Sequence, residues 1–221
     1  FAIEDSIWPF FWMLPEQMEQ GGRIIELERI WPAKEQAEQG MIEYMERISG
    51  IKLIAGRPTI TEARRVTDFK YNVFFTEIPG RDMLRGIYYI TADPEKGGLG
   101  FNLIVGGKAH EDDKLPQEWV NQLKEYNNDP RLQGRFIYTI WNTEVAKKVI
   151  QGSKASLQTS IPPYEAAGMK DKKDMICYNI VVSSYTGGPI QQLTNVLHHG
   201  IKGNGYIFES FSQLRLQEVL E

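Results

Sequence analysis

The stretch Lys70–Gly107, KYNVFFTEIPGRDMLRGIYYITADPEKGGLGFNLIVGG, organises the predicted fold of the first half of the chain. It contains three runs rich in aromatic and β-branched residues, which are typical of strands. The runs are Tyr71–Ile78, Leu84–Thr91 and Leu99–Val105. The gaps between them hold Pro79-Gly80 and the turn-forming segment 93–98, and both are short enough for hairpins. The stretch therefore predicts a three-stranded antiparallel meander.

The second half of the chain has a different rhythm, because strand-like runs alternate with helix-like ones. The strand-like runs are Arg135–Trp141, Met175–Ser183 and Gly205–Phe211, and the helix-like runs are Thr143–Gln151 and Pro189–His199. This order favours a sheet with at least some parallel pairing. We therefore expect an α+β fold, with the antiparallel meander first and then a strand–helix–strand half with mixed sheet pairing.

Other elements are predicted from periodicity and turn residues. Apolar residues at spacings of three and four predict helices over Ala33–Ile48 and Pro116–Tyr126. Pro58–Thr61 fits a short strand, whereas Glu62–Phe69 has no clear period. The expected core consists of twelve large residues. They are Phe74, Ile87, Tyr89, Leu103, Val105, Ile137, Ile176, Ile180, Val182, Leu193, Leu197 and Ile207.

We expect one α+β domain over residues 16–221, preceded by an aromatic arm over residues 1–15. The segment Ser153–Lys173 contains Pro162-Pro163 and a lysine-rich turn, so it is expected to form a long loop. Loops of this length inside compact domains usually have a functional role.

Composition argues against several function classes. Lys and Arg total 25 and Asp and Glu total 29, so the net charge of −4 provides no electrostatic footprint for nucleic acid. Cys177 is the single cysteine, which excludes an intrachain disulfide and a multi-cysteine metal site. The histidines, His110 and the pair His198-His199, lack the spacing of metal ligands. We therefore expect no nucleic-acid partner, no metal and no cofactor. The apolar run 7–14 is shorter than the roughly 20 residues of a transmembrane helix, so no spanning segment is expected.

The arm Phe1–Pro15 carries two Trp and three Phe. Aromatic residues at this density either cover their own domain or bind a partner. We expect a mixed arrangement, in which Phe10, Phe11 and Trp12 contact another protein or a second copy of the chain. The favoured function is accordingly a non-enzymatic protein–protein interaction or assembly module.

A second hypothesis is a small anion-binding domain with its site at the turn 183–188. This turn joins an apolar strand to the start of a helix, where backbone N–H groups favour anions. The candidate residues are Ser183, Ser184, Thr186, Gly187 and Gly188. An ordinary polar turn explains the same residues, and no phosphate-binding glycine motif of a nucleotide site is present.

A third hypothesis is a Ser/Lys acyl-transfer enzyme. Ser49-Gly50-Ile51-Lys52, Tyr126-Asn127-Asn128 and Tyr185-Thr186-Gly187 follow the order of three motifs in β-lactamases and penicillin-binding proteins. The match is imperfect, because Ser49 follows a predicted helix instead of opening one and Tyr185 replaces the lysine of the third motif. No residue is assigned a catalytic role on this basis.

Overall fold

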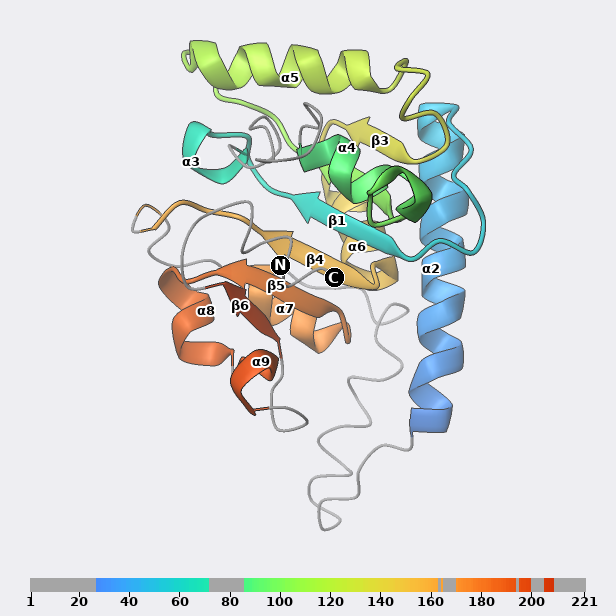
Figure 1. Cartoon of the computed structure of the whole chain (residues 1–221), viewed down its shortest axis with the longest axis vertical. Helices are drawn as coiled ribbons and strands as arrows, with labels where there is room; N and C mark the ends of the chain where they lie inside the picture. The colour runs from blue at the N-terminus through green and yellow to red at the C-terminus, as the bar shows by residue number, and fades with distance from the viewer. Residues whose placement is uncertain are drawn as a thin grey trace.

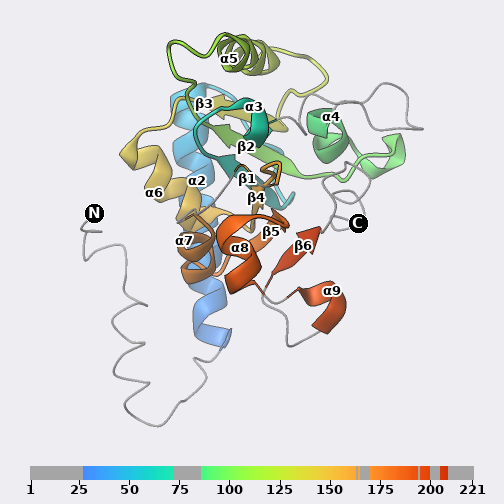
Figure 2. The same cartoon turned by 90° about the vertical axis from the view of Figure 1, so that its left-hand side faces the viewer.

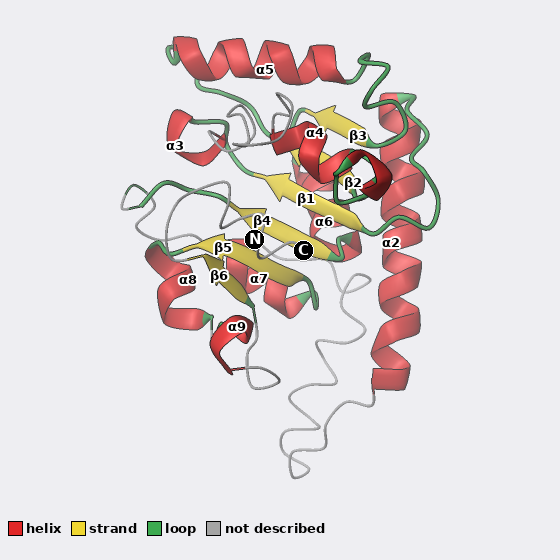
Figure 3. Cartoon of the chain, viewed as in Figure 1, coloured by secondary structure: helices red, strands yellow, loops and turns green. Residues whose placement is uncertain are grey.

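A single parallel sheet forms the centre of the molecule (Figures 1 and 3). The computed structural model describes residues 27–71, 86–162, 164, 170–193, 195–199 and 205–208. Its six strands lie in the order β3-β2-β1-β4-β5-β6, and every neighbouring pair is parallel. The strands are β1 (Thr59–Ala63), β2 (Asn102–Gly106), β3 (Phe136–Thr139), β4 (Ala155–Gln158), β5 (Ile180–Ser184) and β6 (Tyr206–Phe208).

Helices cover both faces of this sheet, as the burial of parallel strands requires. The helices are α2 (Leu27–Ser49), α3 (Asp68–Tyr71), α4 (Gly86–Thr91), the 3-10 turn η3 (Pro94–Lys96), α5 (Lys114–Tyr126), α6 (Thr143–Gly152), α7 (Lys170–Ile176), α8 (Gly187–Gln192) and α9 (Val196–His199). Figure 2 shows α2, α6 and α7 on one side of the sheet and α4 on the other. The fold is therefore α/β.

The predicted α+β class was wrong, and so was the antiparallel meander. The described part of the expected strand Leu84–Thr91 is the helix α4, and all six residues of α4 are buried. A run that is apolar on every side has no period, so its sequence does not separate helix from strand. The expected strand Leu99–Val105 does contain β2, but β2 pairs in parallel with β1 and β3. Of Tyr71–Ile78, only Tyr71 lies within the described residues, where it ends α3.

Mixed pairing in the second half was also wrong, since β4, β5 and β6 are all parallel. The strand β4 lies inside Ser153–Lys173, the stretch expected to be a loop. Its sequence, Ala-Ser-Leu-Gln, is short and half polar, so nothing in it signals a central strand. Met175 and Ile176 belong to α7, and the expected helix Pro189–His199 is divided into α8 and α9.

Helices with a clear amphipathic period were predicted correctly. Ala33–Ile48 lies within α2, Pro116–Tyr126 within α5, and Thr143–Gln151 within α6. Eight of the expected core residues are buried, namely Ile87, Tyr89, Leu103, Val105, Ile137, Val182, Leu193 and Ile207. Ile176, Ile180 and Leu197 are instead exposed, and Phe74 lies outside the described residues.

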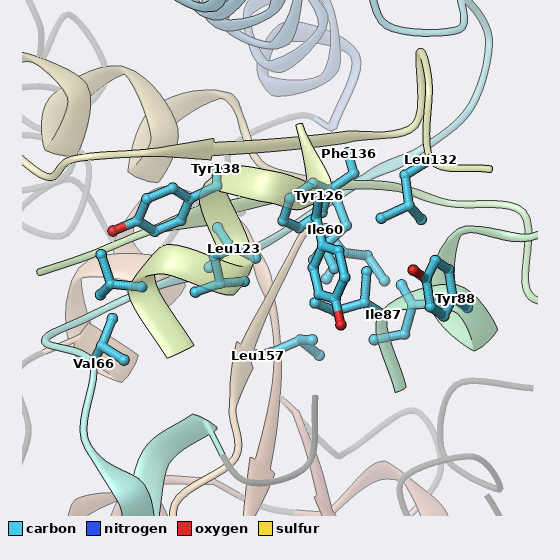
Figure 4. Close-up of a cluster of buried hydrophobic side chains, with 14 of the residues drawn as sticks. Ile60, Val66, Ile87, Tyr88, Leu123, Tyr126, Leu132, Phe136, Tyr138 and Leu157 are labelled. Atoms are coloured by element: carbon cyan, nitrogen blue, oxygen red, sulfur yellow. The ribbon is translucent and has the colours of Figure 1, made fainter. Parts of the chain in front are cut away.

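Three apolar clusters of described residues hold the helices to the sheet, and the two larger ones lie on opposite faces. On the α4 and α5 side, Tyr126 packs edge-on against Phe136 with ring centroids 6.2 Å apart (Figure 4). On the other side, Met41 and Met45 of α2 pack with Val145 and Val149 of α6. Gly152 permits this contact, because a Cβ at that position would lie 2.4 Å from the Cβ of Met41.

In the described part of the chain, an asparagine amide pairs with the backbone of one residue in each outermost strand. Asn127 donates to the Tyr138 carbonyl (3.0 Å) and accepts from the Tyr138 N–H (2.7 Å) on the free side of β3. Asn195 makes the same pair of bonds with Ile207 of β6, at 2.8 Å and 3.3 Å. These amides satisfy the backbone groups that an added strand would need at the middle of each edge.

Candidate functional site

The strand order reverses direction between β1 and β4. From β1 the chain moves outward to β2 and β3, and then returns through α6 to place β4 on the other side of β1. The connections that leave β1 and β4 therefore diverge at the carboxyl edge, which faces the viewer in Figure 2. In open parallel α/β sheets, ligands bind at the carboxyl ends of the strands at such a switch point.

A buried ion pair lies at this point. Glu62, near the end of β1, is fully buried and accepts from Arg64 Nε (2.5 Å) and from a terminal nitrogen of the same guanidinium (3.1 Å). The other terminal nitrogen donates to Ser160 Oγ (2.7 Å), so Arg64 bridges the connections that follow β1 and β4. Burying an ion pair contributes little net stability, because desolvation offsets the attraction. Fold stability therefore does not explain why this pair occupies the switch point.

The connection that follows β4 is hydrogen-bonded to the short helix α3. Ile161 N–H donates to the Phe69 carbonyl (2.7 Å), and Thr159 Oγ1 donates to the Lys70 carbonyl (2.8 Å). These two bonds fix the connection after β1 against the connection after β4. The connections after β1 (residues 64–71) and at the end of β4 (residues 158–162) therefore contact each other at the switch point. We call this contact region the seam.

Gln158, the last residue of β4, is 5% exposed. Its side-chain nitrogen Nε2 has no hydrogen-bond partner among the described residues. A buried amide donor without a partner is costly, so an acceptor oxygen placed here would be favourable. Gln158 is the last residue of β4, so it lies at the carboxyl edge. Among the described residues of β4, it is the one whose side chain has a hydrogen-bond donor without a partner.

Cationic side chains gather beside the seam. The bonds Arg64 N–H to Gly106 O (3.0 Å) and Val66 N–H to Lys108 O (3.1 Å) extend the pairing of β1 and β2 beyond Ala63 and Gly106, where the two strands end. This register places Arg65 next to Lys108, and both are exposed. Like charges at opposed positions repel, and an anion between them relieves the repulsion.

Counting the surrounding charges supports the same conclusion. Residues 62–70 together with Lys108 carry four cationic and two acidic side chains, although the whole chain is acidic. The acidic run Glu111–Asp113 lies further along the same connection as Lys108, between β2 and α5. Residues 62–70 together with Lys108 therefore carry two more cationic than acidic side chains.

The predicted turn 183–188 lies at the same edge, one strand further along. Ser183 and Ser184 are fully buried, and their hydroxyls donate to the carbonyls of Gln158 and Ser160. Thr186 is also buried, while Gly187 has a positive φ of 47° and opens α8. Because the serine protons are already used, this turn offers an anion less than the seam does, and its ligand role stays a prediction. Gly188 follows in α8.

The three motifs of the acyl-transfer hypothesis do not come together. Ser49 ends α2 and Tyr126 ends α5, so both precede strands and lie toward the amino edge. Tyr185-Thr186-Gly187 lies at the carboxyl edge. The Ser49 hydroxyl donates to the Met45 carbonyl (2.7 Å) in its own helix.

The arm residues Phe10, Phe11 and Trp12 lie outside the described residues, so their partner role stays a prediction. Sequence reasoning missed Arg64, Arg65, Gln158 and Ser160 altogether. The available signal was weak, namely two adjacent arginines directly after a short strand.

A shallow hollow of about 450 Å³ lies at the amino edge, between the end of α5 and α4. Three of its polar side chains, Tyr88, Asp129 and Arg131, pair with one another. Tyr88 OH donates to Asp129 Oδ2 (2.7 Å), and Arg131 binds the same carboxylate (2.7 Å) and covers the Tyr88 ring. Hydrogen bonding from Arg131 holds the pKa of Asp129 well below its usual range, and burial raises the pKa of Tyr88. We interpret this cluster as structural, because it joins α4 to the segment that precedes β3.

Within the described part of the chain, no three His, Cys, Asp or Glu side chains group as metal ligands. None of the described helices has the length and hydrophobicity needed to cross a membrane. Comparison with known proteins found no family model that matches this chain and no similar curated protein.

Proposed function

We propose that this chain is a binding domain for a small phosphorylated ligand, held at the carboxyl ends of β1 and β4. The observation that carries the proposal is the reversal of strand order at this point in an all-parallel sheet. The ligand class is the small anion of the second sequence hypothesis. The site is displaced from the turn 183–188 to the neighbouring seam.

The side chains at the seam suit a phosphate group. Arg65 and Lys108 supply positive charge from adjacent positions, and charge-assisted bonds to phosphate are among the stronger hydrogen bonds in proteins. The unused Nε2 of Gln158 supplies a donor from β4. The hydrogen bonds from Arg64 to Glu62 and Ser160 hold the connections after β1 and β4 at a fixed spacing. The binding site is therefore preorganised for its ligand.

The interaction-module hypothesis also stays a proposal, since its main residues lie outside the described ranges. Strand addition is a poor route to such an interaction at the middle of either sheet edge, because Asn127 and Asn195 already occupy the backbone groups there.

The proposal is tested by titrating the protein with ribose 5-phosphate in a calorimeter. Arg65→Ala and Lys108→Ala are each expected to weaken binding about ten-fold, the loss of one charge-assisted hydrogen bond. Both residues are exposed, so unfolding midpoints should change little. Lys96→Ala removes a side chain that is 71% exposed and lies before β2, and it serves as the matched control.

Binding that is unaffected by Arg65→Ala and Lys108→Ala would contradict the proposal. So would equal weakening by Lys96→Ala, which would indicate a general charge effect. A titration that shows no heat of binding at millimolar ribose 5-phosphate would also contradict the proposal.

A further inference from the structure

Two aromatic rings lie beside the seam, one from each connection. Phe69 belongs to α3 after β1, and Tyr164 follows β4. Their ring centroids are 6.0 Å apart with the planes tilted by 40°. Ile161 ties both residues to the end of β4, since its N–H donates to the Phe69 carbonyl (2.7 Å) and its carbonyl accepts from the Tyr164 N–H (3.0 Å).

The Tyr164 ring is open to an incoming molecule. Tyr164 is 69% exposed and is the most exposed large hydrophobic residue in the described part of the chain. The Lys70 ammonium lies 5.3 Å from the centre of the Phe69 ring. An aromatic face next to positive charge is the combination that binds a planar base attached to a phosphate.

The local sequence also limits the form of the ligand. A dinucleotide site needs glycines after β1, so that the backbone can approach a pyrophosphate closely. Here β1 is followed by Arg64-Arg65-Val66-Thr67, with no glycine. Phosphate recognition at this seam therefore depends on side chains, which suits a single phosphate group more than a pyrophosphate.

We propose that the ligand at the seam is a nucleoside monophosphate, whose base stacks on Tyr164 and whose phosphate is bound by Arg65 and Lys108. This inference rests on the proposed function and adds the base to it. The Phe69 ring contacts the Tyr164 ring, with centroids 6.0 Å apart, and joins it to α3.

The test compares AMP with ribose 5-phosphate, which carries the same phosphate and sugar without the base. Calorimetric titration of the wild-type chain should give an affinity for AMP roughly ten-fold or more above that for ribose 5-phosphate. Tyr164→Ala should remove this preference and leave the affinity for ribose 5-phosphate unchanged. Tyr164→Phe keeps the ring and should keep the preference.

Tyr185→Ala is the matched control, because Tyr185 is another exposed tyrosine at the carboxyl edge, beyond β5. It should leave both affinities unchanged. Two results would overturn this inference and leave the proposed function intact. One is equal wild-type affinity for AMP and ribose 5-phosphate, and the other is a preference for AMP that persists in Tyr164→Ala. Failure of both ligands to bind would remove the proposed function itself.

Discussion

Replacing Asp174 with alanine is expected to lower the free energy of unfolding by about 3–5 kcal/mol, the range for breaking a buried ion pair. Asp174 lies in α7 and is fully buried. Its carboxylate accepts from Ser156 Oγ (2.6 Å), Lys170 Nζ (2.9 Å) and Asn179 Nδ2 (3.1 Å). Without it, the Lys170 ammonium, which is 11% exposed, loses its counter-charge.

The effect is expected to be large because Asp174 lies at the centre of a network that joins four elements. Lys34 of α2 donates to the carbonyls of Gln151 (2.7 Å) and Cys177 (2.9 Å), and to the side chain of Asn179. Burial lowers the pKa of Lys34 to about 8, and the nearby Asp174 charge opposes this decrease. Loss of Asp174 therefore weakens the attachment of α2 as well as that of α7.

Urea denaturation measures the Asp174→Ala effect directly. Asp112→Ala is the control, because its carboxylate is 86% exposed and contacts only the exposed His110 in the described structure. A similar unfolding midpoint for the two variants would show that the network of Asp174 contributes no more than a surface charge.

Arg64→Met is expected to cost a similar amount, about 3–5 kcal/mol, because it leaves the fully buried Glu62 carboxylate without its partner. The double variant Glu62→Leu/Arg64→Met removes both charges together. Its stability is expected to return to within about 1 kcal/mol of the wild type or to exceed it, since apolar replacements of buried pairs are often neutral or stabilising.

The comparison of these two variants separates folding from function at the switch point. Recovery in the double variant means that the pair is not needed for stability, as expected if it shapes a binding seam. A double variant as unstable as Arg64→Met would instead assign Glu62 and Arg64 a structural role. Denaturation curves of the three proteins decide between these outcomes.

Elements with a one-sided apolar face could be predicted from the sequence. The helices α2, α5 and α6 each show a helical period, because one face packs on the sheet and the other meets water. The helix α4 could not be recognised in the same way, since Gly86–Thr91 is buried all round. Its aromatic and β-branched residues suit a strand as well as a buried helix.

The parallel pairing was hidden for a different reason. It depends on β4, a four-residue strand whose Ser156 bonds Asp174 and whose Gln158 meets the carboxyl edge. These polar residues are buried because of long-range partners, which local patterns do not encode. Without β4, the alternation of strands and helices in the second half predicted only part of the parallel pairing, and the short gaps between residues 71 and 105 favoured hairpins in the first half.

The residues of the proposed seam were not predicted from the sequence. The turn 183–188 was singled out because it joins a strand to a helix, and it does lie at the carboxyl edge. Arg64 and Ser160 are 96 positions apart and meet only through the strand order. No spacing in the sequence signals such a contact, so the seam emerged from the topology.

The most direct test of a ligand at the switch point is amide hydrogen exchange with and without ribose 5-phosphate. Binding at the seam predicts slower exchange at residues 64–71, 106–108 and 158–162, which lie at or follow the carboxyl ends of β1, β2 and β4. Slower exchange at residues 88–93 and 125–131 instead would place the ligand at the amino-edge hollow around Tyr88 and Arg131, and would contradict the account.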